Sequence, residues 1–177
     1  SRDYSYLPSK NGETLADRIA QHVLDNHAPS YTKYSFLDRR SDERQYCSVG
    51  VDLPVVTVAR TLYWHYPEYH TSKDDLTVIS PEGLGGGYMA LRRCVECLEG
   101  NRTMKVTTPC EPQLGKRGLY PTLSRGRGNT VYILNELTAM DLLNMWAYSN
   151  GDDDLLEVAD KIGVPMWNLL SAIEAFE

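Results

Sequence analysis

The sequence predicts an α/β domain followed by a small helical domain with a helix-turn-helix. Helix-like and strand-like patterns alternate over the first hundred residues, and a Pro- and Gly-rich connector follows them. Residues 129–177 hold nine acidic residues and one base, Lys161, a net charge of −8 that leaves +2 for residues 1–128. A charge step of this size indicates two units with different surfaces.

Two helices are expected in the first hundred residues. The first is capped by Asn11 or Thr14, carries Leu15, Ile19 and Val23 at helical spacing, and stops near residues 26–29. Pro81 starts the second helix. Its apolar residues share one face: Leu84, Tyr88, Leu91, Val95 and Leu98.

Two strands are predicted between these helices. Residues 31–36 are strand-like by their aromatic content, and the β-branched run 54–59 is typical of a buried strand. Two strands cannot bury both helices, so we expect further strands from polypeptide outside this chain or from a partner. The glycines of residues 83–87 fit close helix packing better than a phosphate loop.

The second half is predicted to be helical from Val131 onward, after possible short strands at 104–108 and 119–123. Asn150-Gly151 breaks the first helix, which is expected to carry four apolar residues. Asp152–Asp154 cap the next helix, and Gly163-Val164-Pro165 leads into the third. The apolar residues of that first helix are Leu134, Leu137, Met140 and Leu143.

The charge of this helix-turn-helix argues against binding to nucleic acid. A DNA-binding module places Lys or Arg near its recognition helix to neutralise phosphates. The third helix has no base and carries Glu174 and Glu177. A protein-contact or lid domain is the preferred interpretation.

Two polar clusters flank the predicted strand at 54–59. The first runs from Ser41 to Tyr46 and the second from Glu68 to Asp75. Loops at the ends of a buried strand are where α/β proteins place side chains that act on ligands. The sequence therefore predicts a site formed by these two clusters.

His70 is the strongest candidate ligand, because neighbouring polar groups could fix its tautomer. His65 is interpreted as a loop residue, His22 as solvated, and His27 as close to a helix dipole. Cys94 and Cys97 form a lone C-x-x-C, for which buried structural thiols are the favoured interpretation.

Several motifs resemble a known family. The pattern from Ser41-Asp42 to Pro54, followed by Tyr69-His70-Thr71 and Asp74, resembles the C-terminal part of the catalytic domain of zinc-dependent aminopeptidases, whose fold glutaminyl-cyclase-like enzymes share. A bacterial family of aminopeptidase-like proteins is more similar still, and its members end in a winged-helix module. Its motifs match residues 4–9, 41–48, 68–74 and 111–124.

The resemblance implies a domain organisation and a mixed sheet of the zinc-peptidase type. Residues 1–110 would be the C-terminal part of the aminopeptidase-like α/β domain, 111–128 a connector, and 129–177 the winged-helix module.

The resemblance also implies roles for individual residues. His70 would be the last zinc ligand, and Tyr69 would help to stabilise the tetrahedral intermediate. One or two Zn²⁺ ions would lower the pKa of bound water toward ~7 and polarise the scissile carbonyl. The remaining candidates would be second-shell or substrate-binding groups: Asp42, Glu43, Gln45, Tyr46, Glu68 and Asp74.

The other zinc ligands and the general base lie, in that family, before the segment that matches Tyr4–Ser9. We therefore expect this chain to be the C-terminal half of a longer hydrolase that cleaves peptide or amide bonds, inactive without its N-terminal part. Without a leader sequence or an apolar run near ~20 residues, a cytoplasmic protein with no membrane contact is expected. A homo-oligomer stays possible.

Two other functions stay open. The chain could be a non-catalytic binding or assembly module that keeps the peptidase fold. A DNA-binding regulator is the third hypothesis, which the acidic charge of residues 129–177 disfavours.

Overall fold

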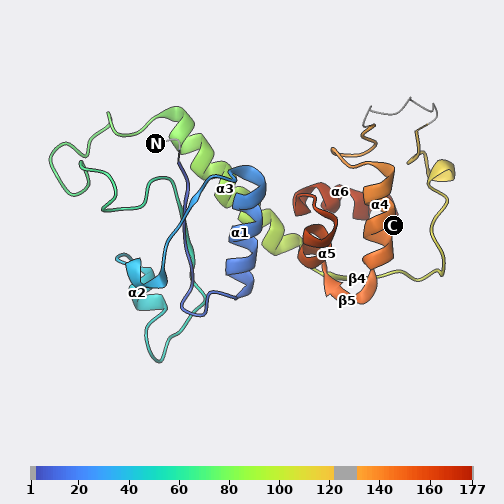
Figure 1. Ribbon diagram of the computed structural model, residues 1–177, viewed down its shortest axis with the longest axis horizontal. Helices are drawn as coiled ribbons and strands as arrows, with labels where there is room; N and C mark the ends of the chain where they lie inside the picture. Colours follow the sequence, from blue (N-terminus) through green and yellow to red (C-terminus); the bar gives the residue numbers. More distant parts are fainter. Residues whose placement is uncertain (1–2, 122–130, 177) are drawn as a thin grey trace. The chain divides into compact units, whose positions relative to one another are not determined.

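The structure is a computed structural model that describes residues 3–121 and 131–176. The chain divides into two compact units, Ser1–Leu98 and Glu99–Glu177, here called unit 1 and unit 2 (Figure 1). Unit 1 combines a small mixed sheet with helices, and unit 2 combines a strand pair with helices. The mixed α/β class predicted from the sequence is confirmed at this level.

The sheet of unit 1 is built around a strand that the sequence did not predict. Strand β1, Ser5–Leu7, lies between β2, Thr32–Lys33, and β3, Thr57–Ala59. It pairs in parallel with β2 and antiparallel with β3. All three residues of β1 are buried, so this short segment is the centre of the sheet.

Both predicted strands are shorter than expected. The aromatic segment 31–36 holds only the two residues of β2, because Ser35 caps a 3₁₀ turn at Phe36–Asp38. The run 54–59 forms a strand only over β3, and the prediction that it is buried is wrong. The three residues of β3 are half-buried, as suits an edge strand with one face on the core.

Helix α1, Leu15–His27, begins as the sequence predicts, with Thr14 as its cap. The Thr14 side chain accepts a hydrogen bond from the Asp17 backbone N–H, and the Asp17 carboxylate accepts one from the Thr14 backbone N–H. Asp17 is fully buried and does more than cap. Its carboxylate also accepts hydrogen bonds from the Tyr6 hydroxyl at 2.7 Å, the Ser9 backbone N–H at 2.8 Å and the Ser9 hydroxyl at 2.5 Å.

The inner side of α1 packs on the sheet. Ala20 and Leu24 form a buried cluster with Tyr6, against which Val58 of β3 packs. His22 is 4% exposed, so the prediction that it is solvated is wrong. It lies one position before Val23 on the buried side of the helix.

Helix α3, Pro81–Gly100, confirms the second predicted helix. The glycines in its first turns allow close packing, as expected. A Cβ at Gly86 would lie 2.6 Å from the Tyr4 hydroxyl and 2.7 Å from Arg60 Nη1. The Arg60 guanidinium stacks on the Tyr4 ring, with its carbon 3.7 Å from the ring centroid.

Unit 2 pairs two short strands and packs three helices against one another. Strand β4, Thr103–Lys105, lies in the segment where a strand was predicted and pairs antiparallel with β5, Asn150–Asp154. The helices are α4, Ala139–Tyr148, α5, Leu155–Ile162, and α6, Met166–Phe176. Their buried core includes Leu142, Met145, Leu155, Leu156, Met166 and Leu169.

The prediction of helix from Val131 onward is wrong at two places. Residues 131–138 are not helical, because Thr138 and Asp141 form a capping box that starts α4 at Ala139. The predicted break after this helix is confirmed, since α4 ends at Tyr148, but Asn150 and Gly151 lie in strand β5, which was not expected, and Gly151 takes a φ of 96° there. Asp154 caps α5, and Gly163 ends it in the left-handed conformation.

The connector predicted at 111–128 is described only in part. Leu114–Arg117 forms a 3₁₀ turn, and Leu119, Tyr120 and Pro121 are not in a strand. The rest of the strand expected at 119–123 lies outside the described residues. Within the described part of the chain, no helix is both long and apolar enough to cross a lipid bilayer.

Candidate functional site

The first predicted cluster folds around the carboxylate of Glu43. This residue starts a single-turn helix, α2, Glu43–Tyr46, where the sequence suggested a loop. Glu43 is 3% exposed, and its Oε1 accepts hydrogen bonds from the backbone N–H groups of Arg40 and Ser41, at 2.7 and 2.9 Å. The hydroxyl of Tyr63 donates a third at 2.5 Å.

These hydrogen bonds keep Glu43 ionised. Burial alone would raise its pKa, but the hydrogen bonds from Tyr63 and from the backbone outweigh burial and lower it. The pKa of Tyr63 rises to about 12, through burial first and the Glu43 carboxylate second. Tyr63 therefore remains a protonated donor that ties the first cluster to the segment preceding the second.

An aromatic cluster extends from Tyr63 to His70. Its members are Tyr63, Trp64, Tyr66, Tyr69 and His70. The rings of Tyr69 and His70 stack, with centroids 4.2 Å apart and planes at 13°. The Tyr63 and Trp64 rings lie 6.3 and 5.2 Å from the Tyr69 ring. The two predicted clusters are thus linked through Glu43, Tyr63, Tyr69 and His70.

Two residues of this aromatic cluster have left-handed backbone conformations. Trp64 has a φ of 67° and His70 a φ of 58°, and their rings are 5.6 Å apart. Such conformations are costly for bulky residues and persist only where the surroundings enforce them. The His70 side chain is exposed, so the loop presents its imidazole to solvent.

Successive turns hold the segment around His70. The Thr71 hydroxyl donates to the Glu68 carbonyl at 2.7 Å and accepts from the Lys73 backbone N–H at 3.2 Å. The Thr71 carbonyl accepts a hydrogen bond from the Asp74 backbone N–H at 3.1 Å. The pKa of Tyr66 is raised by burial first, and then by Asp74, Tyr69 and Glu68.

The other predicted site residues lie apart from this contact chain. Asp42 and Gln45 are exposed and Tyr46 is 50% exposed. The Asp42 side chain makes no capping hydrogen bond to α2. Among residues 3–121 and 131–176, no group of three or more His, Cys, Asp or Glu side chains is arranged to hold a metal ion. A zinc site usually has three or four protein ligands, so the described residues do not form one by themselves.

A pocket of about 420 Å³ opens beside the second cluster. Tyr66 and Glu68 line it from one side, and Val78, Ile79 and Leu84 add apolar surface. Glu68 is the one predicted site residue among its lining residues.

Sequence reasoning missed Tyr63, which joins the two predicted clusters, and Asp17, which organises the Tyr4–Ser9 segment. The spacing Thr14-x-x-Asp17 is a capping-box signal that could have identified Asp17 as a structural residue. No sequence pattern could have identified Tyr63, because Glu43 and Tyr63 lie 20 residues apart and meet only in the fold.

The two buried carboxylates predict a pH dependence of stability. The pKa values of Asp17 and Glu43 lie below those of the unfolded chain, because hydrogen bonds to the ionised forms outweigh burial. Their stabilisation is therefore present above about pH 4–5 and is lost as the pH falls through the lowered folded-state values. Unfolding free energies measured in urea between pH 7 and 3 should fall, and Glu43→Gln should flatten this slope. Glu13→Gln is the control, because Glu13 is exposed, and it should keep the wild-type slope. A wild-type slope for Glu43→Gln would contradict the lowered pKa assigned to Glu43.

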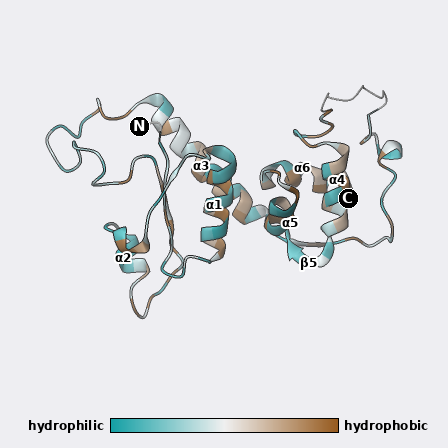
Figure 2. Cartoon of the chain, in the orientation of Figure 1, coloured by the Kyte–Doolittle hydropathy of each residue, from teal (hydrophilic) through white to brown (hydrophobic). Residues whose placement is uncertain are grey.

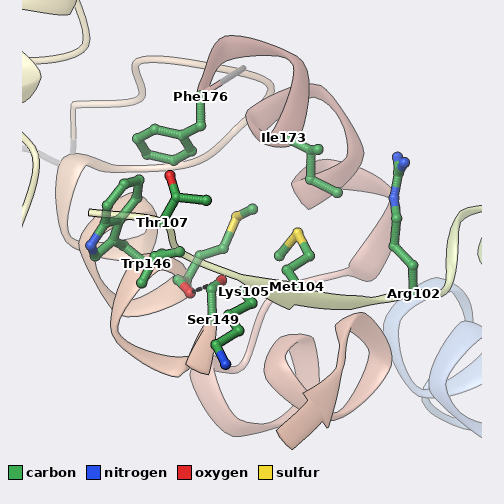
Figure 3. Close-up of a pocket in the computed structure, with 10 residues that line it drawn as sticks. Arg102, Met104, Lys105, Thr107, Trp146, Ser149, Ile173 and Phe176 are labelled. Atoms are coloured by element: carbon green, nitrogen blue, oxygen red, sulfur yellow. Dashed lines mark hydrogen bonds between the residues drawn. The ribbon is translucent and has the colours of Figure 1, made fainter. Parts of the chain in front are cut away.

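Unit 2 has a pocket of its own, with a volume of about 400 Å³. Trp146 and Phe176 lie at one end of it and Arg102 at the other (Figure 3). Met104 of β4 and Ile173 of α6 lie between these ends. Part of the apolar surface of α6 therefore faces β4.

Comparison with known proteins defines an α/β part that belongs to a family of unknown function, followed by a winged helix-turn-helix. Residues 1–101 match the family described as a domain of unknown function, DUF4910, and the chain belongs to that family. Residues 102–177 match a winged helix-turn-helix family.

Two relatives come from Clostridium acetobutylicum. A protein whose name assigns it a role in polysaccharide biosynthesis and an aminopeptidase-like domain is 34% identical over 172 residues, which cover 97% of this chain and 38% of that protein. A crystal structure described as a candidate peptidase superposes with a TM-score of 0.79 at 28% identity, covering 99% of this chain and 37% of that one. This chain thus spans little more than a third of the length of either relative.

Proposed function

We propose that this chain is one part of an aminopeptidase-like hydrolase and that its Tyr69-His70 loop forms one wall of the active site. One observation carries this proposal. The His70 imidazole is exposed and stacks on the Tyr69 ring, and the His70 backbone is held in the left-handed conformation. Backbone strain of this kind is concentrated at functional sites. The peptidase-like names of the two relatives support the same reaction class.

The finer proposal is a zinc-dependent site of the glutaminyl-cyclase-like type. His70 would supply one imidazole ligand, and Tyr69 would lie next to it to bind a developing oxyanion. Bound zinc would polarise the carbonyl of a peptide or amide substrate. Glu43 would act through Tyr63, whose ring neighbours Tyr69. A zinc site usually has three or four protein ligands, so the rest would come from polypeptide outside this chain.

His70→Ala in the full-length protein tests this proposal. Loss of a residue that only supports a zinc ligand lowers zinc affinity by about 10–100-fold. Because His70 would be a ligand itself, we expect its loss to lower zinc affinity by more than this, and hydrolysis to fall in parallel. Bound zinc is measured by mass spectrometry after dialysis, and activity with aminoacyl and amide substrates. His65→Ala is the matched control, because His65 is an exposed histidine of the same loop whose ring packs on Tyr34 at 4.8 Å. Unchanged zinc content and activity in His70→Ala would refute the role of His70.

A second candidate is a non-catalytic binding or assembly module with a peptidase fold. The net charge of −8 on residues 129–177 favours it, because an acidic helical module is suited to contacts with a protein partner. A full-length protein that binds no zinc and hydrolyses no peptide or amide, while remaining folded, would support this candidate over the hydrolase.

A further inference from the structure

One face of helix α3 carries large apolar side chains that the described residues of unit 1 leave exposed. Leu91, Val95 and Leu98 are 52, 57 and 52% exposed, and Leu84 and Tyr88 are 60 and 64% exposed. Their spacing is that of the stripe which an amphipathic helix buries. Apolar residues recur among polar ones along α3 (Figure 2). Soluble proteins seldom leave a contiguous apolar surface of this kind open without a function.

An apolar groove continues this face. It has a volume of about 170 Å³ and lies between α1, the segment of β3, and α3. Burial raises the pKa of the Cys94 thiol in its wall to about 11, so that thiol behaves as a packing group. The other main lining residues are Ile19, Ala20, Val56, Val58, Leu91 and Val95.

The charged side chains of α3 next to this surface pair with one another. Arg92 and Arg93 both bind the Glu96 carboxylate, at 2.8 and 2.7 Å. An apolar partner could therefore cover Leu91 and Val95 without burying an unpaired charge. The sheet beside the groove has three short strands, too few to cover both α1 and α3.

The relatives indicate what covers the surface. They match nearly all of this chain, yet the matched part is only 38% and 37% of their lengths. We propose that the α3 face and its groove dock the apolar layer of polypeptide that completes the aminopeptidase-like domain. This proposal rests only on the peptidase-like architecture of the proposed function and needs neither zinc nor catalysis.

Thiol labelling measures whether the surface is covered. A reporter cysteine is introduced by Leu91→Cys or Arg92→Cys in a Cys94→Ala, Cys110→Ser background. Cys110 is an exposed native thiol and Cys94 is a half-buried thiol in the wall of the groove, whereas the remaining Cys47 and Cys97 are buried. Leu91 is 52% exposed and the Arg92 side chain 54%, so these adjacent positions of one helix are matched controls. Both should react at similar rates in the 177-residue chain. In the full-length protein, the thiol from Leu91→Cys should react at least about tenfold more slowly than that from Arg92→Cys.

Equal labelling rates at the two positions in the full-length protein would overturn the proposal. A second outcome would also overturn it. If the 177-residue chain were already protected, and this protection rose with its concentration and accompanied the mass of a dimer, the occupant would be a second copy. The labelling outcome is independent of zinc and of activity. A failed zinc experiment with preserved protection would therefore reject the proposed function and leave the docking surface intact.

Discussion

Asp17→Ala is expected to destabilise unit 1 by about 3–5 kcal/mol, which would be a large part of the stability of a small domain. The substitution removes the acceptor for the hydroxyls of Tyr6, Ser9 and Thr14 and for two backbone N–H groups. Tyr6 and Ser9 are 4% and 2% exposed, so little water can replace the lost carboxylate. Urea unfolding followed by circular dichroism measures the change.

Asp25→Ala is the matched control, because Asp25 is an exposed aspartate on the same helix. It should change the unfolding free energy by no more than about 0.5 kcal/mol. Asp17→Asn keeps most of the shape and restores part of the acceptor capacity, so it should lie between the two. If Asp17→Ala were as mild as Asp25→Ala, the hydrogen bonds around Asp17 would not hold α1 to the Tyr4–Ser9 segment.

Leu142→Ala is expected to destabilise unit 2 by about 2–5 kcal/mol, because it opens a cavity in a packed core. Leu142 is fully buried in α4, one residue after Asp141 of the capping box. Helix α4 packs on α5. Thermal unfolding of the 177-residue chain, followed by the fluorescence of Trp146 and Trp167, would report the loss.

Met140→Ala is the control on the same helix. Met140 is one of the apolar residues predicted for this helix, and its side chain is 60% exposed. Its replacement should therefore cost less than about 1 kcal/mol. A larger cost for Met140→Ala than for Leu142→Ala would contradict the burial of Leu142 and the exposure of Met140 in this structure.

Local signals predicted the helices and missed much of the sheet. Thr14, Pro81 and Asp154 mark helix starts by chemistry that acts within one turn, so the sequence reveals them. Strand β5 contains Asn, Gly and three aspartates, which have low strand propensity, and forms because β4 pairs with it. Such pairing depends on residues far away in the chain, which periodicity does not reveal. The same limit hid β1, whose three residues show no alternation.

The candidate site was predictable as a pair of clusters but not as a set of contacts. His70 and Tyr69 stood out by composition and by resemblance, and the structure stacks them. Glu43 was expected to be a second-shell or substrate-binding group, and no sequence signal indicated that its carboxylate would accept hydrogen bonds from the backbone and from Tyr63. Asp42 and Gln45 look equivalent to Glu43 in the sequence, yet only Glu43 is buried. Burial distinguishes them, and burial is a property of the fold.

The position of β1 has a consequence for the order in which unit 1 assembles. Tyr6 pairs with Lys33 on one side and with Val58 on the other. During synthesis this central segment leaves the ribosome before either neighbour exists. Its apolar side chains must wait for partners, and pairings between distant residues form slowly because a loop must close first. Until Val58 emerges, the buried residues of β1 lack their partners on β3, and a chaperone that binds short apolar segments would act on β1 in that time.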